Sequence, residues 1–424
     1  MGDPVMNRKL ALVVAAGLVC SLAAGCRAGS PADATDKEVA TSPGITATEV
    51  LIGTTAPISG AYAVNGIYVQ GAKAYFDHVN EQGGVEMADG KKRKVNFKFY
   101  DDAYDPARAL SNCKQFAEQD QGFAMVLING SPTGLACKDF LNQSKVPHPL
   151  HFSSSQVFSL GGADDLGTGF PLTYVTESAI IADIVKTNDP DARAAILKFD
   201  GEAGLEFANG FKSAVTGSGV QVVAEETYKG SDPSVNSQMS RILNEKPNVL
   251  LQFTAGKTIS QVVSSLYGAT PPVTDYLVSV GASTANLEPA GLEKANGVRA
   301  VVWAKDPSDP GYQNDKDVTL FKELVSKYGE GRDLEISITA MYGFIGAQLV
   351  VDALKRSEPN RDSFMEASRN FKDVKVAGLL PDVSANTGPN DPFLIESGRE
   401  KVFADGGWKL EKDLYSYEGR SPRP

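Results

Sequence analysis

Histidine is scarce in this chain of 424 residues, and positive charge is outnumbered by negative charge. Of the three histidines, His148 and His151 are close in sequence, but they would meet on one face only in a helix, which Pro147 and Pro149 disfavour. The 41 Lys and Arg residues stand against 52 Asp and Glu, for a net charge of -11. That sign is unfavourable for contact with phosphate backbones or anionic membranes. We therefore expect neither a metal site nor a nucleic-acid partner.

Motifs for cofactors and catalysis are also missing. Gly256-Lys257-Thr258 follows an apolar strand, but the first glycine of a phosphate-binding loop would fall at Leu251, so the backbone nest for an anion cannot form. Gly161-Gly162 lies in a loop without the glycine pattern of dinucleotide binding. The sequence has no Gly-x-Ser-x-Gly elbow. We expect no cofactor, no catalytic residues and no enzymatic activity.

Uninterrupted apolar runs long enough to span a membrane are lacking beyond the N-terminal region. The longest run, 336–354, is broken by Ser337, Thr339, Gln348 and Asp352, so it predicts a buried helix. The chain is nevertheless long enough for two domains of ordinary size with substantial cores.

The N-terminus carries a secretion signal. Arg8 and Lys9 form a positive region, and Leu10 to Val19 form an apolar segment of about ten residues. The sequence Leu22-Ala23-Ala24-Gly25-Cys26 resembles the bacterial lipobox, in which the cysteine is lipidated and the preceding peptide, here 1–25, is removed. The usual Leu three places before the cysteine is Ala23 here. A plain secretory signal cut near the same point is the alternative.

Cysteine usage fits an oxidising compartment. Cys20 leaves with the signal and Cys26 is assigned to the lipid, so Cys113 and Cys137 remain as one pair. We predict a disulfide between them, and two buried free thiols are the alternative. Residues 26–45 contain few large apolar side chains and predict a flexible tether.

Strand and helix patterns alternate from residue 46 onward. Strands are predicted at 50–52, 95–99, 124–128, 194–199, 220–224, 249–253, 276–280 and 298–303. Asp105-Pro106 and Asp232-Pro233 are expected to start helices, and late helices are expected at 318–328, 336–356 and 363–371. This alternation predicts an α/β fold of two successive, doubly wound parallel sheets with helices on both faces.

Hydroxyl side chains and glycines recur where predicted strands end. They occur at Ser59-Gly60, 130–133, 153–155, Thr254 and 281–283. In open α/β sheets ligands bind at this edge, close to helix N-termini. Hydroxyls, backbone N–H groups and helix dipoles together suit a carboxylate without any formal positive charge. The alternative is that these residues are helix caps and turn residues only.

Six further segments, together with these, carry a family resemblance. They are 56–60, 80–85, 100–106, 145–147, 289–292 and 305–310. Over about 53–408 the chain resembles the extracytoplasmic solute-binding proteins of ATP-binding-cassette (ABC) importers, in the branched-chain amino acid (Leu/Ile/Val-binding) family. The resemblance implies the type I periplasmic-binding-protein fold, with two Rossmann-like lobes joined by a three-segment hinge that closes on a small ligand.

The resemblance also implies lobe boundaries and ligand-binding residues. It assigns 46–171 and 303–378 to an N-terminal lobe, 172–302 and 379–413 to a C-terminal lobe, and 414–424 to a tail. Ligand residues are expected in the first lobe at Ser59, Asn65, Ser131, Thr133, Ser153 and Ser155, and in the second lobe at Tyr174, Thr254, Gly281 and Ser283.

The ligand expectation departs from amino-acid binders in one respect. Those proteins place an acidic residue near Gly281 and an aromatic near Thr254 to hold the ammonium group, and the sequence offers neither at these positions. A buried ammonium without a countercharge would cost several kcal/mol. We therefore expect a small organic carboxylate, aromatic or aliphatic, with a branched-chain amino acid as the alternative.

The expected partners are an ABC permease and its ATPase. The expected location is the outer face of the cell membrane or the periplasm, with the lipid as the only membrane contact, and the protein is expected to be a monomer. An alternative of a different class is a tethered sensor that passes the ligand signal to a membrane receptor.

Overall fold

A computed structural model describes residues 42–162 and 164–423. The predicted signal peptide, Cys26 and the tether up to residue 41 lie outside these residues. The last tether residues, 42–45, pack onto the folded chain: Ser42 N–H donates to the Pro359 carbonyl at 3.3 Å, and Ile45 is buried and forms a β-bridge with Val50. An apolar Ile45 side chain explains why the folded part begins earlier than expected.

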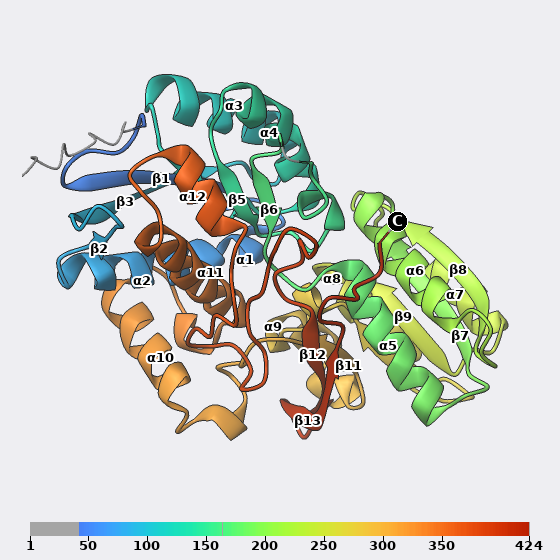
Figure 1. Cartoon of the computed structure of the whole chain (residues 1–424). Helices are drawn as coiled ribbons and strands as arrows, with labels where there is room; N and C mark the ends of the chain where they lie inside the picture. The colour runs from blue at the N-terminus through green and yellow to red at the C-terminus, as the bar shows by residue number, and fades with distance from the viewer. Residues whose placement is uncertain (1–41, 163, 424) are drawn as a thin grey trace, which may run out of the picture. The chain divides into compact units, whose positions relative to one another are not determined.

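A four-stranded sheet forms the centre of the first lobe (Figure 1). Its order is β2-β3-β1-β4, formed by β1 (Glu49–Ala56), β2 (Val85–Glu86), β3 (Lys92–Asp101) and β4 (Ala124–Met125). β1 pairs in parallel with β3 and β4, whereas β2 forms an antiparallel pair with β3. A short parallel pair, β5 (His148–His151) with β6 (Gly167–Gly169), lies next to β4, where Met125 N–H donates to the Pro147 carbonyl at 2.9 Å.

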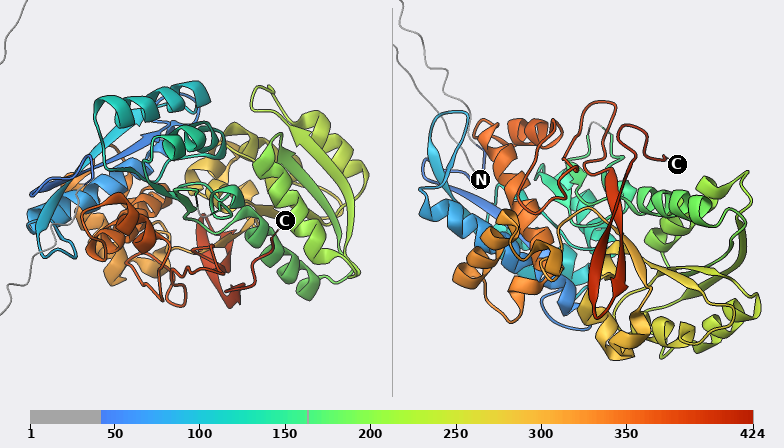
Figure 2. Two further views of the ribbon diagram at one scale, coloured as in Figure 1. Left: turned by 45° about the horizontal axis from the view of Figure 1, so that its top comes forward. Right: turned by 90° about the horizontal axis from the view of Figure 1, so that it is seen from below.

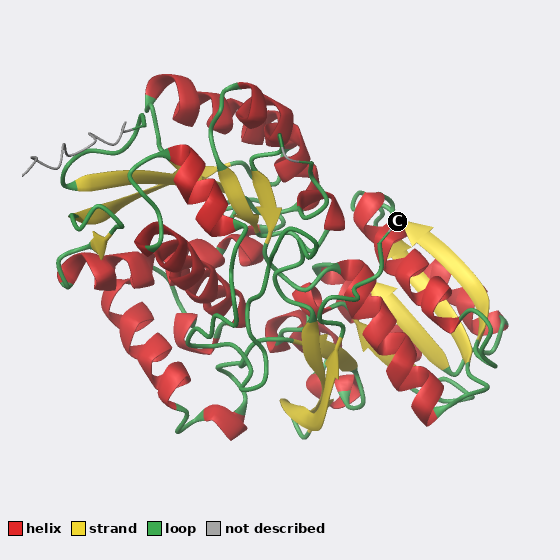
Figure 3. Cartoon of the chain, viewed as in Figure 1, coloured by secondary structure: helices red, strands yellow, loops and turns green. Residues whose placement is uncertain are grey.

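Helices cover both faces of the first lobe's sheet (Figure 3). One face carries α2 (Tyr68–Glu81), α10 (Lys316–Tyr328) and α11 (Ile338–Lys355), and the other carries α3 (Pro106–Lys114) and α4 (Ser131–Gln143). The short helices α1 (Ala63–Gly66) and α12 (Arg361–Ser368) complete the lobe. The predicted buried helix at 336–356 is confirmed as α11. Within 42–162 and 164–423, no helix has the length and apolarity needed to cross a membrane.

Cys113 and Cys137 join α3 to α4. Their sulfurs form a disulfide with Cα atoms 6.0 Å apart, and both residues are buried. The predicted pairing is therefore confirmed, and it fixes the two helices that cover one face of the first sheet. α4 is the helix whose N-terminus lies at the candidate site.

A seven-stranded sheet forms the second lobe. Its order is β13-β12-β11-β10-β9-β7-β8, formed by β7 (Arg193–Phe199), β8 (Gln221–Tyr228), β9 (Val249–Phe253), β10 (Thr274–Leu277), β11 (Arg299–Val302), β12 (Ser397–Ala404) and β13 (Gly407–Ser416). The strands from β8 to β11 are parallel, and the hairpin of β12 and β13 adds an antiparallel edge (Figure 2).

Alternating side chains of the second sheet face two helical layers. Ile196 and Leu251 pack with α5 (Tyr174–Asn188) and α6 (Glu202–Val215), whereas Ala195 and Leu250 pack with α7 (Asn236–Asn244). α8 (Lys257–Leu266) and the short α9 (Thr284–Leu287) complete the lobe. Burial on both faces explains why Val249–Phe253 is apolar at every position except Gln252.

Three segments cross between the lobes, at 171–173, 303–306 and 379–395. Two of them are hydrogen-bonded to each other, because Leu380 N–H donates to the Trp303 carbonyl at 3.1 Å and Lys305 N–H donates to the Gly378 carbonyl at 2.8 Å. We propose these crossings as the lobe boundaries. The two-lobed α/β fold with three connections agrees with the sequence prediction.

Several predicted element boundaries were wrong, among them the strand predicted at 124–128, which ends at Met125, and the helix predicted at 363–371, which is Arg361–Ser368. Residues 131–134 form the first turn of α4 instead of a loop, because Gly130 adopts φ 88° and precedes the helix directly. α7 begins at Asn236, because the Asp232 carboxylate accepts from Lys229 N–H at 2.8 Å and closes a turn there. β10 ends at Leu277, and 279–281 form a 3-10 turn.

The predicted tail is part of the folded protein. β13 continues to Ser416, and Ser421 is buried, where its hydroxyl accepts from the Thr176 hydroxyl at 2.8 Å. The Ser421 N–H also donates to the Glu396 carboxylate at 3.2 Å. Polar side chains therefore bind the C-terminal residues to α5 although these residues contain few apolar groups.

Close packing of α2 on α11 depends on two glycines. A Cβ at Gly343 would lie 1.8 Å from the Tyr68 carbonyl oxygen, and a Cβ at Gly71 would lie 1.8 Å from the Ala340 carbonyl oxygen. Both obstacles are backbone atoms of the facing helix, so a side chain at either position would separate the helices. These helices pack directly on the first sheet.

We predict that Gly343→Ala lowers the free energy of unfolding by about 1–3 kcal/mol, although Ala is the better helix former. Urea unfolding would measure the change. Gly407→Ala is the control, because a Cβ there meets no atom within 4 Å. Equal stability of the two variants would contradict this account of the helix contact.

Candidate functional site

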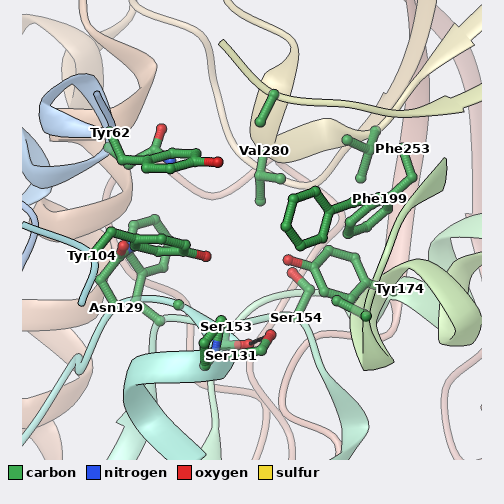
Figure 4. Close-up of a pocket in the computed structure, with 18 of the residues that line it drawn as sticks. Tyr62, Tyr104, Asn129, Ser131, Ser153, Ser154, Tyr174, Phe199, Phe253 and Val280 are labelled. Atoms are coloured by element: carbon green, nitrogen blue, oxygen red, sulfur yellow. Dashed lines mark hydrogen bonds between the residues drawn. The ribbon is translucent and has the colours of Figure 1, made fainter. Parts of the chain in front are cut away.

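A cavity of about 300 Å³ lies between the two lobes, at the carboxyl ends of their strands (Figure 4). The first lobe contributes residues that follow β1, β3, β4 and β5 and two residues of α11. The second lobe contributes residues at or just beyond the ends of β7, β8, β9 and β10. This is the edge at which ligands bind in open α/β sheets. The cavity therefore occupies the place that the sequence pattern indicates.

The polar part of the cavity is formed by α4 and the two loops beside it. The Ser131 and Ser153 hydroxyls are 2.8 Å apart and both residues line the cavity. Ser154 Oγ and Asn129 Oδ1 are buried without a hydrogen-bond partner in the described chain. Ser131 is the first residue of α4, where backbone N–H groups lack intrahelical partners and the helix dipole is positive. The arrangement suits an anionic group.

Aromatic rings form most of the remaining wall. They belong to Tyr62, Tyr104, Phe152, Tyr174, Phe199, Tyr228, Phe253 and Tyr342. The Tyr62 and Tyr104 rings lie 4.5 Å apart, and the Tyr174 ring meets Phe253 edge-on at 4.7 Å. Figure 4 shows the first pair on one side of the cavity and the second, with Phe199, on the other. Aromatic faces and edges suit a flat or apolar ligand body.

The tyrosine hydroxyls of the cavity are neutral at pH 7, and burial moves them further from ionisation. Burial raises the pKa of Tyr104 and of Tyr174 above the ordinary value of 10.0, and in both cases desolvation is the largest cause. These phenols therefore act as hydrogen-bond donors at neutral pH, and they add no negative charge that would repel an anion.

Formal charge at the cavity is limited to one carboxylate. Among the described residues that line the cavity, none is Lys, Arg or His, and Glu202 is the one acidic residue. Glu202 is the first residue of α6 and is exposed. A ligand anion would thus be held by hydroxyl and N–H groups, while Glu202 could pair with a ligand cation.

The structure brings half of the predicted ligand residues to the cavity. The residues that line it are Asn65, Ser131, Ser153, Tyr174 and Thr254. Thr254 is partly committed, because its hydroxyl donates to Gln252 Oε1 at 2.7 Å.

The other predicted residues lie outside the lining. The Ser59 hydroxyl donates to the Asp101 carboxylate at 2.5 Å, and the Thr133 hydroxyl donates to the Gly130 carbonyl at 3.0 Å. Ser155 points to Glu206, at 2.8 Å. Gly281 and Ser283 also lie off the lining, where Val278 and Val280 stand instead. Ser59 and Thr133 therefore have the alternative role predicted from the sequence, as turn and helix-end residues.

Sequence reasoning missed seven of the eight aromatic residues, although a signal existed. Phe199, Tyr228 and Phe253 are the last residues of β7, β8 and β9, which are neighbours in the sheet. An aromatic residue at the carboxyl end of adjacent strands points to the ligand edge. The statement that no aromatic lies near Thr254 was wrong, because Phe253 precedes it and lines the cavity. An acidic residue was also missed, at Glu202.

The expectation that His148 and His151 stay apart was wrong. His148 Nδ1 lies 2.8 Å from His151 Nε2, although the segment is a strand. Leu150 adopts φ 59° and the pairing of β5 with β6 shifts between the two histidines, which turns both rings to one side. Burial lowers the pKa of His148 to about 4, so this pair is neutral at pH 7.

Metal-ligand atoms gather elsewhere in the described chain. Only Asp391, Glu396 and Glu418 bring three such oxygen atoms within 4.8 Å of one another, and none of these residues lines the cavity. Among the described residues that line the cavity, no cluster of metal ligands occurs.

Two buried carboxyl groups stand just behind the cavity wall. Glu177 on α5 accepts from Ser279 N–H at 2.6 Å and from the Ser279 hydroxyl at 2.7 Å, and burial raises its pKa to about 8. Glu206 on α6 accepts from Ser155 and Gln156, and burial raises its pKa to about 7. The contact between Glu177 and Ser279 lies within the second lobe. The contact of Glu206 with Ser155 and Gln156 joins the two lobes.

The fold and the site define a two-lobed α/β protein with a ligand-sized cavity between its lobes. The chain belongs to the periplasmic binding protein family, because the model of that family matches residues 49–391. The curated Leu/Ile/Val-binding protein homolog 3 of Brucella melitensis is 26% identical over 203 residues, which cover 46% of this chain and 51% of that protein. The chain spans about half the length of the curated relatives it matches.

Solved structures share the fold at low sequence identity. A branched chain amino acid ABC transporter from Thermus thermophilus with bound valine has a TM-score of 0.75 and 14% identity, with 87% of this chain and 97% of that chain covered. A solute binding protein of an ABC transporter from R. palustris in complex with 4-hydroxybenzoate has a TM-score of 0.71 and 17% identity, with the same coverage of 87% and 97%. The predicted fold class is confirmed.

We predict that Glu177→Gln raises the free energy of unfolding. The gain over the unchanged chain should grow as the pH rises from 5 to 8. Because the pKa of Glu177 is about 8 in the folded protein and ordinarily 4.5, this group loses its proton on unfolding within that range, which favours the unfolded state. Gln removes this penalty, which is on the order of 4 kcal/mol at pH 8.

Urea unfolding at pH 5, 6.5 and 8 would measure this difference. Glu288→Gln, at an exposed position, is the control and should follow the unchanged protein. If the free energy of unfolding changed with pH in the same way for Glu177→Gln and the unchanged protein, Glu177 would not be a buried, protonated group.

Proposed function

We propose that this chain is the substrate-binding protein of an ABC importer, which captures a small organic carboxylate between its lobes and delivers it to a membrane permease. The ligand has an aromatic or aliphatic body and no ammonium group. The protein acts outside the cytoplasm and is held at the membrane by a lipid on Cys26. It does not catalyse a reaction.

The cavity that combines a hydroxyl-lined helix N-terminus with aromatic walls is the observation that carries this proposal. Ser131, Ser153 and Ser154 provide hydroxyls, and the start of α4 provides N–H groups, so a carboxylate would receive several hydrogen bonds. Hydrogen bonds to a charged group contribute about 1.5–3 kcal/mol each. The aromatic wall would take an apolar body, whose burial contributes roughly 25 cal/mol per Å².

The comparisons support the importer assignment. The family model covers both sheets up to residue 391, and relatives of this fold include one solved with an aromatic acid. The absence of Lys and Arg from the described cavity lining favours recognition through neutral donors over recognition through an ion pair. Such a site accepts a carboxylate of a low-polarity molecule without requiring a second charged group on it.

Glu202 favours one second candidate, a branched-chain amino acid. It is the acidic residue of the cavity lining and stands at the start of α6 in the second lobe. A ligand ammonium could pair with it while the carboxylate binds at α4. Because Glu202 is exposed, such a pair would be screened by water and would contribute little. We therefore rank the amino acid below the carboxylate without an ammonium group.

We predict that the protein binds benzoate more tightly than leucine or benzamide, and that Ser131→Ala weakens benzoate binding about tenfold. The variant removes one hydrogen bond to a charged group, worth about 1.5–3 kcal/mol. Isothermal calorimetry with the full mature chain would measure the three ligands.

Ser144→Ala is the matched control, because Ser144 is the residue after α4 and lies at the opposite end of that helix. It should bind benzoate as the unchanged protein does. Benzamide separates charge recognition from the fit of the ring, since it has the same shape without the negative charge. Tight leucine binding with no benzoate binding would overturn the proposed ligand class.

A further inference from the structure

A buried hydrogen-bonded contact joins the two lobes beside the cavity. Glu206 of α6 lies in the second lobe, and it accepts from the Ser155 hydroxyl at 2.8 Å and from Gln156 N–H at 3.2 Å in the first lobe. Ser155 is 1% exposed and Glu206 is 7% exposed. None of the three lines the cavity. The contact exists only while α6 and the loop after β5 lie together, so it depends on how the two lobes are placed.

The same contact is connected to the polar part of the cavity. Ser155 N–H donates to Ser153 Oγ at 3.3 Å, and Ser153 Oγ lies 2.8 Å from Ser131 Oγ. Glu206 in one lobe therefore fixes Ser155, whose backbone orients the two serines that face the ligand from the other lobe. The carboxylate acts at a distance from the ligand, through the backbone of residues 153–156.

We propose that Glu206 is a positioning residue that couples ligand capture to lobe closure, and that it makes closure more favourable in mildly acidic conditions. This inference rests on the proposed function, because it requires a ligand bound between two lobes. Glu206 does not contact the ligand. It stabilises the closed arrangement and holds the cavity serines in place within it.

The acid dependence follows from burial of Glu206 on closure. The groups that face it are Glu202 of α6 and Tyr174 at the start of α5, together with Ser155 and Gln156, and none of these carries a positive charge. Desolvation is the largest cause of its raised pKa, about 7 against an ordinary 4.5. Where the lobes separate, water reaches Glu206 and its pKa falls back, so closure takes up a proton between these values. Lower pH therefore favours closure.

Glu177 provides a matched control within the same protein. It is also a buried glutamate, it accepts from the N–H and hydroxyl of a serine, and its pKa is raised by burial. Its partner Ser279 belongs to the same lobe, however. Lobe opening leaves that contact intact, so Glu177 should not couple protonation to ligand binding.

The test measures benzoate dissociation constants by calorimetry at pH 5.5, 6.5, 7.5 and 8 for the full mature chain and its variants. Benzoate remains ionised over this range. For the unchanged protein we expect about tenfold tighter binding at pH 5.5 than at pH 8. Glu206→Gln should bind benzoate tightly at every pH, with a dissociation constant that does not change with pH, because the amide can still accept from Gln156 N–H and donate to Ser155. Glu177→Gln should keep the tenfold difference in the dissociation constant between pH 5.5 and pH 8.

Small-angle X-ray scattering of the ligand-free proteins makes the test independent of the ligand. We expect the unchanged protein to be more compact at pH 5.5 than at pH 8, and Glu206→Gln to be equally compact at both. The inference would be overturned if the dissociation constant and the compactness changed with pH in the same way for the unchanged protein and for Glu206→Gln. A pH-dependent compaction that Glu206→Gln abolishes, with no benzoate binding, would support Glu206 and contradict the proposed ligand instead.

Discussion

The proposed ligand sets one physical constraint on this structure, which is that an anion must be held without a cation. Hydroxyls and N–H groups satisfy a carboxylate only if several of them point at one place, and Gly130 makes this possible because φ 88° lets α4 begin directly at Ser131. The disulfide to α3 and the packing of α4 on the sheet then fix that helix end. In the proposed function the first lobe is therefore the platform for recognition, since neutral donors lose their effect when they move.

The second lobe extends the aromatic wall that Tyr62 and Tyr104 begin in the first lobe, and in the proposed function this wall takes the ligand body. Phe199, Tyr228 and Phe253 end three adjacent strands, so sheet geometry alone gathers their rings at the cavity. A ligand that contacts both this wall and the serines of the first lobe binds the closed arrangement better than the open one, which is the condition for a ligand to shift the equilibrium. In the proposed mechanism closure also buries Glu206, so that the charge state of this residue and the ligand act on the same equilibrium.

The fold could be predicted from the sequence because each strand or helix is encoded by the pattern of its own residues. Val249–Phe253 and 338–355 are examples. The site could be predicted only in part. Ser131 and Ser153 line the cavity, as hydroxyls at strand ends are expected to do, but Ser155 has the same sequence context and turns to Glu206. Which hydroxyl faces inward depends on a long-range partner that no local pattern encodes. Leu150 shows the same limit, since its positive φ brings two histidines together against the strand pattern.

A crystal structure of the mature protein with benzoate would test the central claim most directly. Our account predicts that the carboxylate oxygens lie within hydrogen-bonding distance of the Ser131 and Ser153 hydroxyls at the start of α4. It also predicts that the ring lies between Tyr104 and Phe199, with no basic side chain in contact. A carboxylate bound to a Lys or Arg, or placed away from α4, would contradict recognition without a cation.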